Sequence, residues 1–188
     1  MAISEEQIVA TLTDVFRTHG YEGASLQIIA RATGLARASL YHRFPGGKAE
    51  MAEAVMKRAQ AWLEAEALAP LRDESLSPRE RIGAMAKHLD AFYQSGQKSC
   101  LLDAMSIGEP GSSLCRLTKG ALDLWARELA AAVVAAGFGP AEARDRAERA
   151  LALIQGTLVM ARVREDPVPF RKVLAELPRQ LLGEYKEP

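Results

Sequence analysis

Four fixed positive charges and one histidine fall within residues 25–48, a stretch that contains no carboxylate. The charges are Arg31, Arg37, Arg43 and Lys48. The whole chain is balanced, with 24 lysines and arginines against 24 aspartates and glutamates, so positive charge is concentrated in this segment. Because phosphate neutralisation supplies most of the sequence-independent affinity for nucleic acid, a compact basic surface on a neutral chain favours a nucleic-acid contact.

The order of residue types in this segment predicts two short helices around a turn. Ser25 is suited to cap a helix over residues 26–33, and Gly34 allows the left-handed turn that ends it. A second helix is expected over residues 35–44, stopped by the Pro-Gly-Gly that follows. The side chains expected to turn inward are Ile28, Ile29, Ala32, Leu35, Leu40 and Phe44. This pattern is typical of a helix-turn-helix, whose second helix enters the major groove of DNA.

The run IIARATGLARASLYHRFPGGKAEM resembles the DNA-binding segment of the tetracycline-repressor (TetR) family of bacterial transcriptional regulators. The shared pattern is an apolar-Ala pair, a turn glycine, a small residue before Leu-Tyr, then His-x-Phe and a lysine that opens the next helix. The Phe-Pro-Gly-Gly-Lys version, with a cysteine shortly after the fifth helix, resembles the drug- and flavonoid-responsive subgroup. Ala36 departs from the family pattern, which usually has a polar cap there, so the start of the second helix is less sharply fixed.

The resemblance implies a set of DNA-contacting residues: Ser25, Gln27, Arg37, Ala38, Ser39, Tyr41, His42 and Lys48. Tyr41 and His42 are expected to contact phosphates. Arg37 and Ser39 are expected to reach base edges, with a phosphate as the alternative partner of the arginine. The serine and the lysine at the ends of this set stand where helices begin, and a helix N-terminus is itself an anion site.

Helical periodicity continues along the rest of the chain. Ser4 and Gln7 form a capping box that opens a first helix, which we expect Gly20 to end. Its apolar stripe is Ile8, Leu12, Val15, Phe16 and His19. Further helices are expected from Lys48 toward Pro70, from Pro78 to Gly96, over part of 97–107, from about Ser113, from Pro140 and after Pro169. The sequence thus predicts an all-α fold of about nine helices.

We expect residues 1–47 to form the helix-turn-helix domain and residues 48–188 a helical ligand-binding and dimerisation domain. Aromatic and methionine side chains on the inner faces of the second domain are most often simple core. Together they indicate a pocket for a small apolar or aromatic effector. The candidates are Trp62, Met85, Leu89, Phe92, Tyr93, Cys100, Met105, Trp125, Gln155 and Met160. Gly156 lies within an expected helix, where glycine costs ~1 kcal/mol relative to alanine, which indicates close packing or a ligand contact.

A single recognition helix reaches only a few base pairs, so specific binding requires two copies on half-sites ~34–36 Å apart. The last two helices are strongly apolar, and across a two-fold axis they would form a four-helix bundle. The residues expected at this homodimer interface are Leu151, Ile154, Leu158, Phe170, Leu174, Leu177 and Leu181.

Other classes of protein find little support in the sequence. Gly47-Lys48 is not a phosphate-binding loop, because His42 and Ala49 stand where that motif needs glycine and Ser/Thr. The chain has no HExxH, GxSxG or CxxC motif, and its three histidines lack metal-ligand spacing, so we expect no catalytic site, metal or cofactor. Two cysteines, no ~20-residue apolar run and no secretory signal at the start favour a cytoplasmic protein without membrane contact.

The sequence therefore predicts a dimeric repressor that binds a palindromic DNA operator and is released by a small effector. An activator of the same fold and an interaction module that has lost DNA binding stay open as alternatives.

Overall fold

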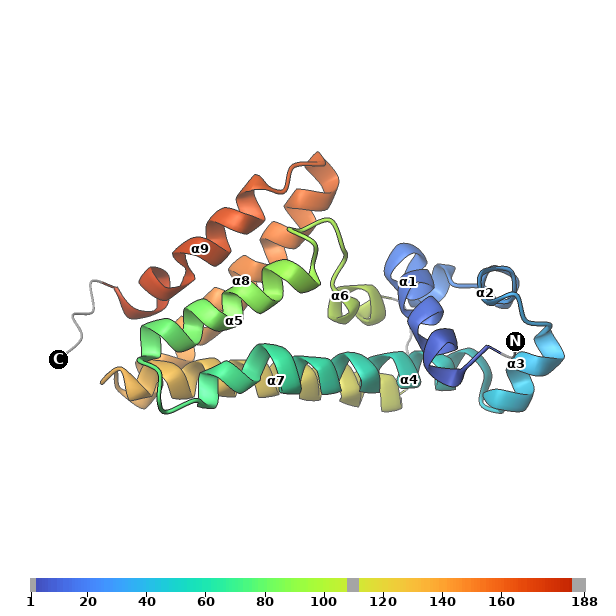
Figure 1. Cartoon of the computed structure of the whole chain (residues 1–188), viewed down its shortest axis with the longest axis horizontal. Helices are drawn as coiled ribbons and strands as arrows, with labels where there is room; N and C mark the ends of the chain where they lie inside the picture. Colours follow the sequence, from blue (N-terminus) through green and yellow to red (C-terminus); the bar gives the residue numbers. More distant parts are fainter. Residues whose placement is uncertain (1–2, 108–111, 184–188) are drawn as a thin grey trace. The chain divides into compact units, whose positions relative to one another are not determined.

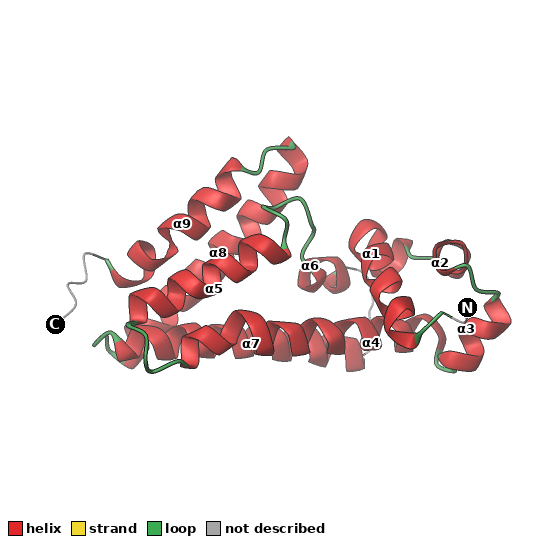
Figure 2. Cartoon of the chain, in the orientation of Figure 1, coloured by secondary structure: helices red, strands yellow, loops and turns green. Residues whose placement is uncertain are grey.

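The computed structural model describes residues 3–107 and 112–183, within which nine α-helices and no strand are found (Figure 2). In chain order (Figure 1) the α-helices are α1 (Glu5–Gly23), α2 (Leu26–Thr33), α3 (Arg37–Arg43), α4 (Gly47–Trp62), α5 (Pro78–Phe92), α6 (Leu101–Ser106), α7 (Ser112–Ala135), α8 (Pro140–Arg164) and α9 (Val168–Leu182). The prediction of an all-α fold is confirmed. Between the helices expected over part of 97–107 and from about Ser113, the sequence Gly-Glu-Pro-Gly at 108–111 favours a break, and these four residues lie outside the described ones.

The chain forms two compact units, each assembled from two segments. The first, called the head here, consists of Met1–Ala61 and Cys100–Ala121, and the second, called the body, consists of Trp62–Ser99 and Leu122–Pro188. The head thus includes most of α4, all of α6 and the first turns of α7, in addition to the three N-terminal helices. The predicted boundary after residue 47 differs from this division, in which each unit is built from two separate segments of the chain.

The head is organised around α1, whose start is fixed by the predicted capping box. The Ser4 hydroxyl accepts a hydrogen bond from the Gln7 backbone N–H (3.2 Å), and the Gln7 side chain accepts one from the Ser4 N–H (2.9 Å). The apolar stripe of α1 packs with the inner faces of α2, α3, α4 and α6 in one core. Its fully buried members include Ile8, Leu12, Phe16, Ile29, Leu40, Met51, Val55 and Met105.

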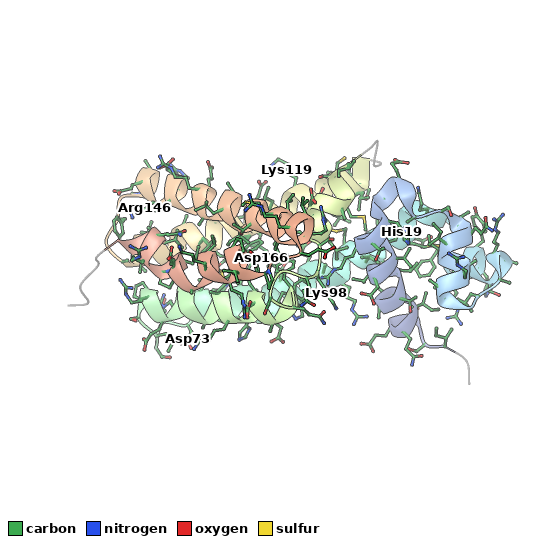
Figure 3. All side chains as sticks on the ribbon, turned by 90° about the horizontal axis from the view of Figure 1, so that it is seen from above. His19, Asp73, Lys98, Lys119, Arg146 and Asp166 are labelled. Atoms are coloured by element: carbon green, nitrogen blue, oxygen red, sulfur yellow. The ribbon has the colours of Figure 1, made fainter. Side chains whose placement is uncertain are left out.

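Three details of the head differ from the prediction. Gly20 does not end α1 but kinks it, with φ 66° and ψ 178°, and the helix continues to Gly23. A Cβ at Gly20 would lie 3.4 Å from the Ala104 carbonyl, so this glycine allows α6 to approach closely. His19 (labelled in Figure 3) and Ala32 are exposed and not inward-facing. In α2 the inward position is taken by Thr33, whose hydroxyl donates to the Ile29 carbonyl (2.8 Å).

The helix expected to run from Lys48 toward Pro70 changes type along its length. It is α-helical to Trp62, continues as a π-helix over Leu63–Leu68, and ends as a 3₁₀-helix over Ala69–Arg72. Such a π-helical segment is a rare insertion in a regular helix, where each hydrogen bond spans one residue more. In the body the π-helix and the 3₁₀-helix both pack against α5.

The fifth helix is shorter than predicted, because α5 ends at Phe92 and Gly96 lies beyond it. Gln94, Ser95 and Gly96 follow in left-handed conformation, with φ of 47°, 56° and 90°. A Cβ at Gly96 would lie 3.2 Å from the Cβ atoms of Ala161 and Phe170. The turn is therefore pressed against α8 and α9, and this packing holds two non-glycine residues in a conformation that is normally unfavourable.

Helices α8 and α9 form an antiparallel hairpin, and α9 packs on α5. Two i,i+4 ion pairs lie along α8, Glu142–Arg146 (2.8 Å) and Asp145–Arg149 (2.9 Å). Arg146, labelled in Figure 3, also donates to the Leu181 carbonyl at the end of α9 (2.8 Å). The helices are thus joined by polar contacts as well as by their apolar faces.

The residues expected at a dimer interface are instead buried inside the body. All seven are at most 5% exposed: Leu151, Ile154, Leu158, Phe170, Leu174, Leu177 and Leu181. The apolar periodicity of α8 and α9 therefore marks their packing within one chain. Any surface that these helices offer to a second chain lies on their other faces.

Candidate nucleic-acid interface

Helices α2 and α3 form the predicted helix-turn-helix. The Ser25 hydroxyl accepts a hydrogen bond from the Ile28 N–H (3.3 Å) and caps α2. Gly34 ends α2 in the left-handed conformation, with φ 68°. Ala36 stands at the N-cap of α3 without a side-chain hydrogen bond, so α3 begins without the polar cap that usually fixes a helix start.

One side of α3 is buried and the other is open to solvent. Leu40 is fully buried and Phe44 is 3% exposed, and these two side chains hold α3 against the core of the head. The expected DNA-contacting residues on α2 and α3 are all exposed: Ser25, Gln27, Arg37, Ala38, Ser39, Tyr41 and His42. The short helix therefore presents a continuous face made of the predicted residue types.

The arginines of this segment are unpaired. Among the described residues no carboxylate forms an ion pair with Arg31, Arg37 or Arg43, and all three side chains are exposed. Arg72 of the body, by contrast, is held in a two-point contact with Glu128 (2.8 and 3.0 Å). Unpaired guanidinium groups with five N–H donors each are suited to phosphates and to guanine edges.

Gly47 supports the position of Tyr41. It has φ 65°, and a Cβ at this position would lie 3.3 Å from Cε1 of the tyrosine ring, so the ring lies over bare backbone. The start of α4 is closed by Glu50, whose carboxylate accepts a hydrogen bond from the Gly46 N–H (2.7 Å). Sequence reasoning did not anticipate this carboxylate at the edge of the basic segment.

Lys48 is partly engaged within the head. Its ammonium group donates to the Tyr21 carbonyl (2.9 Å), lies 4.4 Å from the centre of the Tyr21 ring and is 4.0 Å from the Glu22 carboxylate. Burial, and then the charge of Glu22, raise the pKa of the Tyr21 phenol, which stays neutral. An ammonium has three donors and only one is used by this carbonyl, so Lys48 both fastens α4 to α1 and keeps N–H groups for an anion.

The candidate ligand-binding residues are divided between the two units. Cys100 and Met105 belong to the head, where Met105 is part of the core. The other eight candidates belong to the body: Trp62, Met85, Leu89, Phe92, Tyr93, Trp125, Gln155 and Met160. Met160 does not face the interior, because it is 39% exposed on α8.

Three of these body residues belong to a connected row of aromatic rings. Trp62 stacks face to face on Phe92, with ring centres 3.8 Å apart, and Phe92 meets Tyr93 edge-on at 5.0 Å. Tyr93 in turn meets Phe170 of α9 edge-on at 5.9 Å. Much of the aromatic surface expected to face a ligand is therefore used in ring-to-ring packing.

A groove of about 360 Å³ lies on the surface of α8 and α9. It is lined by Glu142, Asp145, Arg146, Arg149, Ala150, Leu153, Gln180 and Leu181. None of the ten candidate ligand-binding residues belongs to it. Within residues 3–107 and 112–183 no cluster of three potential metal ligands occurs, and no helix is long and apolar enough to cross a membrane.

Two family models match the chain. The model described as bacterial regulatory proteins of the tetR family matches residues 8–55, which include α2 and α3. The model described as the C-terminal domain of LmrA/YxaF-like transcriptional regulators matches residues 78–176, more than half of the chain. Between them the two models span both compact units.

Known proteins agree with this assignment. The chain is 26% identical over 183 residues to the uncharacterized HTH-type transcriptional regulator YxaF of Bacillus subtilis, covering 93% of each chain. A TetR transcriptional regulator from Legionella pneumophila superposes with a TM-score of 0.82 at 23% identity, over 95% of this chain and 97% of that one. BioQ, whose crystal structure contains its double-stranded DNA operator, superposes with a TM-score of 0.60 at 20% identity, over 97% of this chain and 100% of that one.

The fold, the exposed face of α3 and the two family matches lead to one assignment. The chain belongs to the TetR family of bacterial transcriptional regulators, which are DNA-binding proteins and not enzymes.

Proposed function

We propose that this protein is a dimeric repressor that binds a palindromic operator and is released from it by a small effector bound in the body. The observation that carries the proposal is the outward face of α3, where unpaired arginines stand beside hydroxyl and imidazole groups on a rigidly packed helix. The body supplies the dimer interface that joins the two copies required by a palindrome. It also supplies the effector site through which release is controlled.

Operator contacts divide by chemistry. Arg37 and Ser39 reach base edges in the major groove, and Ala38 lets the backbone approach. Tyr41 and His42 contact phosphates on the flanking backbone. Ser25, Gln27 and Lys48 add contacts at the starts of α2 and α4, where helix N-termini favour anions. The fold shared with BioQ, which was solved on its operator, supports this use of the head.

The dimer interface is formed by the outer face of α8. Three apolar side chains are exposed there at helical spacing, Leu153 (44%), Met160 (39%) and Val163 (75%). Gly156 lies on the same stripe, and apart from the nearby backbone of α8 no described atom lies within 4 Å of a Cβ placed there. Because no intrachain packing requires this glycine, its helix-weakening effect of ~1 kcal/mol is explained by the close approach of a second α8.

The effector is a small apolar or aromatic molecule bound in the body. The interior of the body is rich in large apolar side chains, including Met85, Leu89 and Trp125, which suit such a ligand. A difference in effector affinity between free and operator-bound protein of ~1–3 kcal/mol changes operator binding some 5–150-fold. We also propose a cytoplasmic location, a drug- or flavonoid-type effector, and a functional division near residue 47.

Operator binding is tested with the intergenic duplex that flanks the gene. Fluorescence anisotropy across a range of salt concentrations is expected to show tight binding to a segment containing an inverted repeat, weakening steeply as salt rises. A scrambled duplex of the same composition is the control for specificity. Equal binding to both duplexes at all salt concentrations would refute sequence-specific recognition, and loss of reporter repression on deleting the gene identifies the protein as a repressor.

A further inference from the structure

The body buries two side-chain N–H donors that have no acceptor among the described residues. They are Nε1 of Trp125, at the centre of α7, and Nε2 of Gln155, at the centre of α8. The Trp125 side chain is 1% exposed, so its indole N–H has no access to bulk solvent. A buried donor that lacks a partner is unfavourable, and most buried donors in proteins have one.

Of two other buried polar groups in the body, one is satisfied and one is not. The Thr157 hydroxyl, two residues after Gln155, donates to the Leu153 carbonyl (2.7 Å). Asp90 Oδ1 is an unpartnered acceptor at the end of α5, but it bonds to neither donor; its other oxygen lies 3.5 Å from the Ser95 hydroxyl. Asp90 Oδ1 is an acceptor, so the unpartnered buried N–H donors among the described residues of the body are those of Trp125 and Gln155.

The surroundings of Trp125 on its own helix offer no acceptor. The other buried side chains of α7 that belong to the body are all apolar: Leu129, Ala130, Ala132 and Val133. Helix carbonyls at this depth already accept the backbone N–H four residues later. Among the described residues, no acceptor of α7 or of the helices around it bonds to the indole N–H, so an acceptor from a bound molecule would satisfy it.

We infer that the effector bears a hydrogen-bond-accepting oxygen that binds the indole N–H of Trp125, with the Gln155 amide as a second donor. This inference rests on the proposed effector site of the body. It narrows the ligand to a largely apolar, planar molecule with a carbonyl or a comparable acceptor. A pure hydrocarbon fits the apolar walls but leaves both donors unpaired.

The test compares two probes that share a ring system and differ in one acceptor. Fluorene and 9-fluorenone are planar three-ring molecules, and only the second has a carbonyl. Equilibrium dialysis of the full-length protein against each probe is expected to show 9-fluorenone bound about fivefold or more tightly, as one added hydrogen bond implies. Operator binding is measured in parallel on the same preparations.

Matched variants assign that preference to a residue. Trp125→Phe keeps an apolar ring and removes the donor, so the preference for 9-fluorenone is expected to fall to about twofold or less. Tyr21→Phe is the control, because it also removes one donor from an aromatic ring but lies in the head, and it is expected to leave the preference unchanged. Gln155→Met, which has similar length and no donor, is expected to reduce it in part.

The outcomes separate this inference from the proposed function. A preference that persists in Trp125→Phe, equal binding of the two probes, or no binding of either one overturns the inference. Operator binding that stays intact in those cases leaves the proposed DNA-binding function standing. A Trp125-dependent preference without release of the operator supports the inference and contradicts effector-controlled release.

Discussion

At the level of single residues, the side chains of α3 that are available for DNA are those that the core of the head does not bury. Leu40 and Phe44 are buried, and every polar residue between Arg37 and Arg43 is left to solvent. The unpaired state of the three arginines matters because an arginine already held by a carboxylate would have to break that pair before binding DNA. Side-chain substitutions on this face therefore report on DNA contacts more than on folding.

Arg37→Ala is expected to relax base preference at one position of each half-site. A bidentate arginine–guanine contact contributes ~1–3 kcal/mol of discrimination, so the penalty for substituting that base should shrink by roughly 5–100-fold. Anisotropy with a set of operators carrying single base changes measures it. Arg43→Ala serves as the control, since loss of a phosphate contact weakens all operators alike; an unchanged preference in Arg37→Ala would remove Arg37 from base recognition.

Lys48→Met and Tyr41→Phe are expected to weaken binding to all operators in different ways. Loss of the ammonium removes one neutralised phosphate, so the slope of log affinity against log salt should fall by about one. Loss of the tyrosine hydroxyl removes a neutral hydrogen bond and should leave that slope unchanged. Lys48→Met should also lower the melting temperature, because the contacts with the Tyr21 carbonyl and ring are lost. An unaltered salt slope in Lys48→Met would restrict Lys48 to fastening α4 to α1.

At the level of elements, the sequence was informative wherever the signal is local. The Ser4–Gln7 capping box, the Ser25 cap and the left-handed Gly34 each depend on residues within four positions of one another, and all are present. The exposed face of α3 was predictable for the same reason. The helix type beyond Trp62 was not predictable, because the strong helix formers of LEAEAL suit a regular α-helix, whereas this segment is a π-helix that packs against α5.

Contacts between distant segments of the chain also could not be predicted from the sequence. Lys48 meets the Tyr21 carbonyl across 27 residues, and no local pattern signals this contact. The apolar stripes of α8 and α9 showed that these helices are buried, but not whether a neighbouring helix or a second chain covers them. The same periodicity fits both cases. For this reason, residues that pack inside the body were predicted at the dimer interface.

The capping box of α5 provides a test of how one helix start responds to pH. The Ser77 backbone N–H, and then the Ser77 hydroxyl, donate to the Glu80 carboxylate (both 2.9 Å) and lower the pKa of Glu80 below its usual value. Since the folded pKa lies below the unfolded value of about 4.3, the unfolded chain binds more protons in this window. The stabilisation is complete above the unfolded pKa and is lost as pH falls through the folded pKa.

Glu80→Gln should remove this dependence, because a glutamine can accept the same N–H, as Gln7 does at α1. Thermal melts of the native protein and the variant are expected to differ most near pH 6 and to converge as the pH falls toward 3. The difference should be small for so exposed a group. A difference in melting temperature that is the same at every pH would show that the carboxylate charge does not contribute.

At the level of the whole molecule, two copies must be joined for a palindrome to be bound, and the outer face of α8 is the proposed place. A stable interface of this kind buries a continuous apolar surface and depends on close packing at its centre. Leu153, Met160 and Val163 supply exposed apolar side chains along α8. Gly156 lies between them and has no side chain, so a second helix can approach closely there.

Gly156→Leu is accordingly expected to separate the dimer. Gly156 is exposed, and apart from the nearby backbone of α8 no described atom lies within 4 Å of a Cβ there, so the protomer should stay folded with a leucine; loss of the glycine even favours the helix by up to ~1 kcal/mol. Between two chains the added side chain would prevent close approach. Sedimentation should therefore show a monomer, and affinity for the full palindrome should fall toward that for a single half-site. Gly120→Leu is the matched control, because Gly120 also lies within a helix with nothing within 4 Å of its Cβ position but lies off the α8 stripe. If Gly156→Leu stays dimeric while both variants fold, the two-fold contact must lie on another face of the molecule.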